Sequence, residues 1–425
     1  MNQPLEISYA ALSQGRTFEF LRKVSARTLL LTMFASVHAA NWPQWRGPNG
    51  DGMSVETNVP VKWSASENVA WKTPIPGEGH SSPVVWGDSV FLTTAMPNTQ
   101  ERLLLRLDAR TGKLVWQRTV LTAAPEYIHR ENSLASSTPV TDGRWAFTSF
   151  QNGKRAELQC YDFDGKPIWS VQPLEFNGEH GYSYTPLLYR DLLILDCRQE
   201  GEAALLAFDK STGKVRWRVE PSKRRISHIT PLLVSDGRRQ QLIVSGSNET
   251  RSVNPDTGET LWWCRGPSDV AVAGMSYGDG LVFVTAGYPD RVRMGVRVDG
   301  SGDVTETHVA WKSRRQVPYV PSPVYRAGHF YAVLDEGMLC CFNAKTGDTV
   351  WDQRLEGRFR SSLVLAGENC YATNDKGVTT VFRATPLGFE SVSVNDLQEF
   401  CYATPAIADG RLYLRTGKSL FCIGK

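Results

Sequence analysis

Short apolar runs separated by turn residues recur from about residue 60 to the end of the chain. Val90–Leu92 and Leu281–Val284 are two such runs, and each has the length of a β-strand. Pairs of Asp and Gly precede many of them, as expected for hairpin turns. No segment shows sustained helical periodicity. The pattern predicts an all-β chain.

One polar motif recurs between these runs: Asp or Asn, two variable residues, Thr-Gly, three variable residues and then Trp. Full copies begin at Asp108, Asp209, Asn254 and Asn343, and degenerate copies begin at Asp162 and Asp299. The Asp or Asn can accept backbone hydrogen bonds, and the Gly can take the positive φ that closes a turn. The Trp then offers a large apolar face and an N–H to a neighbouring sheet. We expect this docking role for Trp71, Trp116, Trp169, Trp217, Trp262, Trp311 and Trp351.

A second motif, Ser or Thr followed by Pro, starts a strand between successive copies of the first. It occurs at Pro83, Pro139, Pro186, Pro231, Pro323 and Pro405, and Tyr277 and Leu363 hold the same place without Pro. Pro is tolerated at a strand start, where a missing N–H matters least. The Trp positions lie 40 to 53 residues apart, the length of one four-stranded propeller blade. Eight starts predict an eight-bladed β-propeller of four-stranded antiparallel blades.

The two ends of the repeat region are incomplete in complementary ways. The Trp strand Val69–Thr73 precedes every Pro strand, whereas the last repeat stops at Leu420–Ile423 without a Trp strand. We expect the two segments to pair in the last blade and close the ring, which removes exposed edges. Phe389 is expected to replace Trp between the seventh and eighth blades.

The first residues differ from the rest of the chain. Arg22, Lys23 and Arg27 precede an apolar run at 28–35, and Val37–Ala39 supplies small residues for cleavage. This order is typical of a secretory signal peptide, and the run is short for a membrane span. An N-terminal helix, or a start upstream of the true signal, is the alternative. We therefore predict a signal peptide at 1–39, an N-terminal lead-in segment at 40–60, one propeller at 61–425, and a periplasmic or extracellular location.

Charge and cysteine content narrow the function. The 47 basic and 44 acidic residues give a net charge of +3, which does not favour a broad nucleic-acid surface. No later segment is apolar enough to cross a membrane. The eight Cys form no CxxC and no zinc-ligand spacing, so buried free thiols are expected. We expect a monomer that binds neither nucleic acid nor a metal.

The repeat resembles the pyrroloquinoline-quinone (PQQ) type repeat over about residues 60–425. This family includes quinoprotein alcohol dehydrogenases and the outer-membrane assembly lipoprotein of Gram-negative bacteria. The stretch Asn41–Pro48 resembles the start of PQQ-binding-like propeller proteins. The resemblance implies eight blades with Trp docking between them, and it leaves function open because fold and site are separate questions.

In the family members that use PQQ, the cofactor lies between a Trp and a vicinal disulfide, with calcium and a catalytic Asp. Cys340-Cys341 is the only vicinal pair here, and it falls in a predicted strand, where consecutive side chains point to opposite faces. No segment matches the calcium and base motif, and no phosphate loop, zinc motif or nucleophile elbow occurs. We predict no catalytic residue, no metal and no cofactor, with PQQ and calcium as the alternative.

Several polar residues lie just before the strands that start with the second motif. If those strands are innermost, the residues surround one mouth of the central channel, where propeller ligands usually bind. They are His80, His129, Arg130, Glu131, Asn132, His180, His228, Arg360, Glu399 and Tyr402. They predict a polar funnel for a small molecule, a glycan or a peptide. The alternative is a set of loop residues that hydrogen-bond strand ends and channel water.

The sequence therefore favours a non-catalytic extracytoplasmic binding or scaffolding propeller that holds a protein or peptide partner at its channel mouth or a blade edge. A PQQ-dependent oxidoreductase of alcohols or sugars is the alternative. A polysaccharide-binding or polysaccharide-processing protein is a third reading, for which no specific motif occurs.

Overall fold

The computed structural model describes residues 40–199, 201–221 and 227–424. The expected signal peptide at 1–39 lies outside the described residues. Over these ranges the chain forms strands and turns and contains no helix. A helix long and apolar enough to cross a membrane is therefore absent from the described residues.

The strands form eight consecutive antiparallel sheets of four strands each. The first four blades are β3–β6 (Val84–Trp86, Ser89–Met96, Glu101–Asp108, Leu114–Thr122), β7–β10 (Val140–Thr141, Trp145–Asn152, Arg155–Asp162, Pro167–Glu175), β11–β14 (Leu187–Tyr189, Leu192–Cys197, Ala204–Asp209, Val215–Val219) and β15–β18 (Leu232–Ser235, Gln240–Gly246, Glu249–Val253, Thr260–Arg265).

The fifth to eighth blades continue the same order. They are β19, β20, β21 and β23 (Ser276–Gly278, Leu281–Ala286, Val292–Arg297, Val309–Ser313), β24–β27 (Val324–Arg326, His329–Val333, Met338–Asn343, Thr349–Arg354), β28–β31 (Val364–Ala366, Asn369–Thr373, Val378–Arg383, Ser391–Asp396) and β32–β34 (Ala406–Ala408, Arg411–Arg415, Ser419–Ile423) with β2 (Val69–Pro74). Short parallel strands extend two blades: β22 (Gly302–Asp303) pairs with β18, and β1 (Met53–Ser54) pairs with β28.

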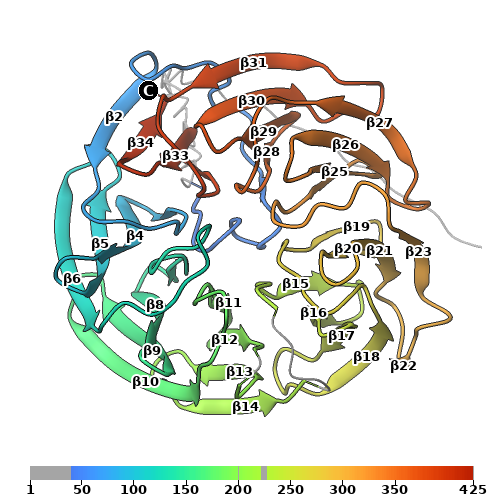
Figure 1. The fold of residues 1–425 in the computed structure, drawn as a ribbon, viewed down its shortest axis with the longest axis horizontal. Coiled ribbons are helices and arrows are strands. Elements are labelled where there is room, and N and C mark those ends of the chain that lie inside the picture. The colour runs from blue at the N-terminus through green and yellow to red at the C-terminus, as the bar shows by residue number, and fades with distance from the viewer. Residues whose placement is uncertain (1–39, 200, 222–226, 425) are drawn as a thin grey trace, which may run out of the picture. The chain divides into compact units, whose positions relative to one another are not determined.

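The blades are arranged around a central axis, as Figure 1 shows, with the first strand of each blade nearest the centre. The strands that follow Ser-Pro or Thr-Pro are these inner strands. The eight-bladed propeller predicted from the sequence is confirmed. In the last blade β2 pairs with β34, with Lys72 opposite Phe421 and Thr73 opposite Leu420. These are the two segments that the sequence analysis expected to meet.

Seven of the eight junctions between blades are made by a Trp side chain through the same contact. Each indole Nε1 donates a hydrogen bond of 2.8 to 3.1 Å to a backbone carbonyl in the turn after the third strand of the following blade. The pairs are Trp71 with Ala109, Trp116 with Phe163, Trp169 with Lys210, Trp217 with Pro255, Trp262 with Val298, Trp311 with Ala344 and Trp351 with Thr385.

The Thr-Gly turn is shaped to receive this indole. In the first copy the Asp108 carboxylate accepts hydrogen bonds from the backbone of Arg110 and Thr111, and Gly112 has a φ of +70°. A Cβ at Gly112 would lie 2.5 Å from the Trp71 ring, so Gly is required both by backbone conformation and by space. Gly213, Gly258 and Gly347 face the ring of the preceding blade's Trp in the same way.

The junction between the seventh and eighth blades departs from the sequence expectation. Phe389 packs on Trp351, at a ring distance of 6.2 Å, between the sixth and seventh blades, so the predicted role of Phe389 is wrong. Ser393 holds the place of Trp in β31. The gap is filled instead by Trp63, which is 3% exposed, stacks on Tyr371 and hydrogen-bonds Asn395 through its backbone N–H.

The lead-in segment crosses the centre of the ring before the chain enters the last blade (Figure 1). Its hydrogen bonds reach the inner strands, or residues flanking them, in seven blades. The pairs are Trp42 with Val85, Pro43 with Thr141, Gln44 with Leu188, Arg46 with Met275 and Pro323, Gly52 with Leu365, and Glu56 with Asp409 and Gly410. The segment therefore covers one mouth of the channel.

Arg46 anchors this segment from a fully buried position. Its guanidinium donates to the carbonyls of Met275 and Asp51, each at 2.8 Å, and to that of Pro323. Burial lowers the pKa of Arg46 to about 10, partly offset by Asp51. One cation thus binds the fifth and sixth blades to the segment.

Trp217→Phe is expected to lower the free energy of unfolding by about 1–3 kcal/mol, because the buried Pro255 carbonyl loses its donor. Urea denaturation followed by circular dichroism measures the change. Val215→Thr, on the same strand but 52% exposed, should change the stability by less than about 0.5 kcal/mol. Equal losses in the two variants would contradict the docking role.

Arg46→Met should destabilise the protein by about 3 kcal/mol or more, because three carbonyls lose a charged donor. The same denaturation experiment applies. Arg314→Met is the control, since Arg314 is exposed and its ion pair with Asp290 is worth about 1 kcal/mol or less. A loss for Arg46→Met no greater than that of the control would disprove the anchoring role.

Candidate functional site

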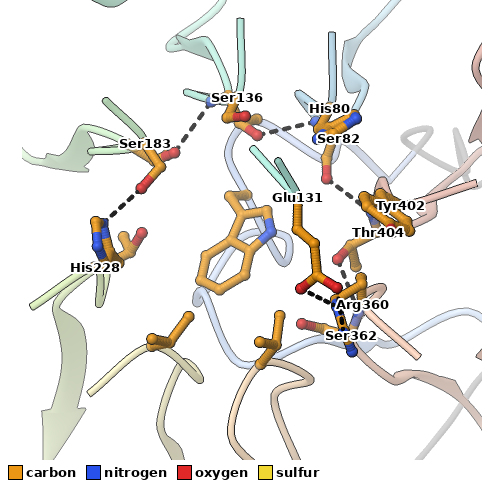
Figure 2. A pocket seen from close by; sticks show the side chains of 16 residues that line it. His80, Ser82, Glu131, Ser136, Ser183, His228, Arg360, Ser362, Tyr402 and Thr404 are labelled. Carbon is orange, nitrogen blue, oxygen red and sulfur yellow. Dashed lines mark hydrogen bonds and ion pairs between the residues drawn. The ribbon is translucent and has the colours of Figure 1, made fainter. Parts of the chain in front are cut away.

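The channel mouth opposite the lead-in segment opens into a cavity of about 180 Å³, called the cup below. Its lining side chains come from the loops before the inner strands and from the lead-in segment (Figure 2). They are Trp45, His80, Ser82, Glu131, Ser136, Thr138, Ser183, Thr185, His228, Thr230, Val272, Val320, Arg360, Ser362, Tyr402 and Thr404.

A ring of hydroxyl groups surrounds the cup where the inner strands begin. In six steps the backbone N–H of one blade donates to the Ser or Thr hydroxyl of the next, at 2.8 to 3.1 Å. The steps are Ser82 to Thr138, Thr138 to Thr185, Gly274 to Ser322, Ser322 to Ser362, Ser362 to Thr404, and Thr404 to Ser82. Except for Gly274, these residues directly precede the strand-starting residues of the second motif, so the motif joins blades at the axis as the Trp joins them further out. In the fifth blade Met275, directly before β19, holds the place of Pro, so the place expected for Tyr277 is wrong by two residues.

The ring of hydroxyls is interrupted on both sides of Thr230. Among the described residues the N–H of Thr185 makes no such bond to the Thr230 hydroxyl, and Gly274 has no side chain to accept the N–H of Thr230. A Cβ at Gly274 would lie 2.9 Å from the Trp45 ring and 3.0 Å from the Ser322 hydroxyl. Gly therefore leaves space for the indole of Trp45, which forms the floor of the cup. The guanidinium carbon of Arg46 lies 5.7 Å from the centroid of that ring.

An ion pair crosses the cup between loops that are far apart in the sequence. Arg360, before β28, donates from Nε and Nη2 to the two carboxylate oxygens of Glu131, before β7, at 3.0 and 2.9 Å. Arg360 also lies 3.5 Å from Asp335. The hydrogen bond from Arg360 lowers the pKa of Glu131. Burial lowers the pKa of Arg360, but Glu131 and Asp335 raise it overall. Both groups are charged at neutral pH.

The two histidines of the cup are neutral at physiological pH. Burial, followed by the charge of Arg415, lowers the pKa of His80 to about 4. Burial, followed by His180, lowers the pKa of His228 to about 4. The His228 Nδ1 lies 2.9 Å from the Ser183 hydroxyl, and the His80 ring packs on Tyr402 at 4.9 Å.

Five of the ten predicted mouth residues line the cup: His80, Glu131, His228, Arg360 and Tyr402. The other five lie nearby and serve different contacts. The His180 ring lies between the rings of His129 and His228, Asn132 hydrogen-bonds the His180 carbonyl, and Arg130 is exposed. Glu399 pairs with Lys72 of β2 at 2.7 Å and with Ser419, so it stabilises the last blade.

Sequence reasoning missed the floor and the ring of hydroxyls. The Ser or Thr before each Pro was visible in the second motif. Each has a free backbone N–H as donor and a hydroxyl as acceptor, and this pairing could have suggested a ring of hydrogen bonds. Trp45 carried no comparable signal, because the lead-in segment has no repeat. Val272 and Val320, which line the remaining wall, are also outside the repeated motifs.

The cup does not fit the PQQ arrangement described for the resembling dehydrogenases. Cys340 and Cys341 lie in β26 with their side chains in separate hydrophobic clusters, and neither lines the cup. All eight Cys are buried with free thiols. Among the described residues, no group of three or more His, Cys, Asp and Glu is placed to hold a metal. We therefore assign no step to PQQ or calcium.

The groups that line the cup can offer hydrogen bonds and apolar contacts. The one carboxylate of the cup is held by Arg360, its imidazoles are neutral, and five of its hydroxyls accept backbone hydrogen bonds within the ring. Such groups can orient a polar ligand by hydrogen bonds, while Trp45, Val272 and Val320 cover its apolar face.

Comparison with known families gives a match over most of the chain. The family model PQQ_2, described as "Outer membrane protein assembly factor BamB", matches residues 55–131, 100–263, 201–325 and 298–385. No curated protein sequence matches the chain.

Solved structures share the fold at low sequence identity. BamB from Moraxella catarrhalis is 14% identical, with a TM-score of 0.59 over 84% of this chain and 99% of that chain. The quinohemoprotein alcohol dehydrogenase ADHIIG from Pseudomonas putida HK5 is 12% identical, with a TM-score of 0.59 over 90% and 80% of the two chains. A europium-containing methanol dehydrogenase is 12% identical, with a TM-score of 0.52 over 81% and 89%. These likenesses concern the fold alone.

The two cup histidines should make stability depend on pH. Unfolded His titrates near pH 6.5, whereas both folded groups titrate near 4. Between these values the unfolded chain binds more protons, so stability falls as pH is lowered from about 6.5 to about 4. The double variant His80→Gln/His228→Gln should therefore lose less thermal stability than the parent between about pH 7 and pH 4.5.

The melting temperature at the two pH values measures this difference. His329→Gln is the control, because the His329 ring lies outside the cup and bonds the Ala327 carbonyl. It should keep the full loss of the parent protein. A double variant as acid-sensitive as the parent would contradict the assignment.

Proposed function

Because the chain belongs to the PQQ-type repeat family described as outer membrane protein assembly factor BamB, we propose that it is a non-catalytic scaffold of the cell envelope that holds a protein or peptide partner at its open channel mouth. The observation that carries the proposal is the difference between the two mouths. The lead-in segment covers one, whereas long polar loops surround the other.

The rim of the open mouth has features of a protein interface. Tyr127 is 77% exposed in the loop that carries Glu131, and Phe400 is 46% exposed in the loop that carries Tyr402. The Phe400 ring lies 4.3 Å from that of Tyr402. Exposed aromatic side chains with nearby Arg are enriched where proteins bind each other, and Arg358 supplies a half-exposed cation that pairs with Glu131 at 3.4 Å.

The state of the ionisable groups supports binding over catalysis. A general base needs an accessible carboxylate or imidazole with a pKa near the working pH. Glu131 is instead paired with Arg360 and Arg358, and the pKa values of His80 and His228 lie near 4. The ion pair also links the loops that enter the second and seventh blades, which restrains the mouth.

An envelope role requires export. The basic, apolar and small-residue regions within residues 1–39 support a cleaved leader, which would place the propeller in the periplasm or outside the cell. The mature chain would then begin with the lead-in segment.

Photo-crosslinking at the rim tests the proposal. With a benzophenone amino acid in place of Tyr127 or Phe400, irradiation of intact cells should give defined adducts with an envelope protein, detected by mass spectrometry. Val55 is the matched control, since it is apolar, 91% exposed and lies in the lead-in segment that covers the other mouth. If no adducts form at Tyr127 or Phe400, or if they are the same as those at Val55, the open mouth is excluded as the partner site.

A further inference from the structure

The interior of the cup has two chemically different walls. Trp45, Val272 and Val320 form an apolar side, and His80, His228 and Tyr402 contribute nitrogen and oxygen atoms on the others. Figure 2 shows His228 with Ser183 on one side of the opening and His80, Tyr402 and Arg360 on the other. A ligand that fills this space needs one apolar face and several hydrogen-bonding groups along its edge.

The cup has no net charge to offer a ligand. Glu131 and Arg360 are its only formally charged lining residues, and they neutralise each other through two hydrogen bonds. A charged ligand would lose hydration without gaining a free counter-ion, which is costly. The electrostatics therefore favour an uncharged molecule.

Three lining groups have unused hydrogen-bonding capacity. Within the described ranges, the Thr230 hydroxyl, the Tyr402 hydroxyl and the His80 ring nitrogens make no hydrogen bond to protein, although each residue lines the cup. Thr230 is also the ring member beside the gap at Gly274, where Trp45 lies. Polar groups in a recess normally find partners in water or a ligand.

The size of the cup limits the ligand further. A volume of about 180 Å³ holds on the order of ten waters, the scale of one sugar ring with its substituents. Because the lead-in segment covers the far mouth, a chain cannot thread through and only its end can enter.

We propose that the cup binds the uncharged terminal pyranose ring of an oligosaccharide, with the C–H face of the sugar on Trp45 and its hydroxyls bonded to Thr230, Tyr402 and His80. Pyranoses combine an apolar face with a polar edge, as the two walls require. This site is recessed behind the rim proposed for the protein partner, and the two functions are independent.

Saturation-transfer NMR and calorimetry with the full protein test the inference. The probes are the methyl glycosides of glucose, galactose, mannose and N-acetylglucosamine, and linear trisaccharides of the same sugars. At least one should bind with a millimolar or lower Kd, with the strongest transfer to C–H protons of one ring face. The matching trisaccharide should bind at least as tightly, through its terminal ring. A methyl glucuronide should bind at least about tenfold more weakly, because its carboxylate would lose hydration without meeting a free counter-ion.

A cyclodextrin separates a chain end from a sugar surface, since it offers glucose rings without an end. It should not bind even if methyl glucoside does. Binding of the cyclodextrin as tightly as the linear sugar would overturn the blind-cup assignment.

Variants locate the site. Trp45→Leu should weaken binding about tenfold by removing the aromatic floor, and Trp86→Leu is the matched control, because Trp86 ends β3 outside the cup. Tyr402→Phe tests the hydrogen-bonding wall without altering the floor, and should weaken binding several-fold with an unchanged melting temperature.

The outcomes distinguish this inference from the proposed function. Failure of every neutral sugar to bind, or unchanged binding in both Trp45→Leu and Tyr402→Phe, would overturn the sugar site while leaving the rim adducts of Tyr127 and Phe400 unaffected. Loss of rim adducts with sugar binding intact would overturn the scaffold proposal alone.

Discussion

The contact between an indole N–H and the turn of the next blade is the interaction on which the structure depends. Both faces of a blade are apolar, and a single blade cannot bury either of them. Its stability therefore comes from packing against the neighbouring blades. The indole fills the space between two sheets, and its hydrogen bond fixes how far one sheet can slide along the next. The turn that receives the indole needs an Asp or Asn and a Gly with positive φ and no Cβ. The sequence motif therefore consists of the residues that this contact requires.

A second set of contacts repeats this arrangement at the axis. The hydroxyls before the inner strands join blades beside the central axis, and all six bonds run in the same direction around the ring. At most junctions, outer indoles and inner hydroxyls together hold neighbouring blades at two radii. The mouth loops can then carry charged and aromatic side chains without being needed for the fold, which is the usual division between scaffold and site.

The parts of the fold that repeat could be predicted from the sequence. The number of blades, the inner position of the Pro strands and the role of the seven Trp follow from local motifs whose backbone requirements are strict. What could not be predicted depends on single tertiary contacts. Trp63 replaces Phe389 because it reaches the last gap from outside the repeat, and Glu131 meets Arg360 across 229 residues. Half of the predicted mouth residues reach the cup. The position of a residue before a strand determines which loop it belongs to, but not the direction in which its side chain points.

The lead-in segment has a consequence for the order in which the protein is made. Its partners at Met275, Pro323, Leu365 and Gly410, and the partner of β2 in β34, are all synthesised long after it. The floor of the cup and the last blade therefore cannot assemble until nearly the whole polypeptide is available, whereas the middle blades can pair as they emerge. A nascent chain halted in the seventh blade would carry stacked sheets but neither a closed ring nor a pocket, so binding competence arises only on completion of synthesis.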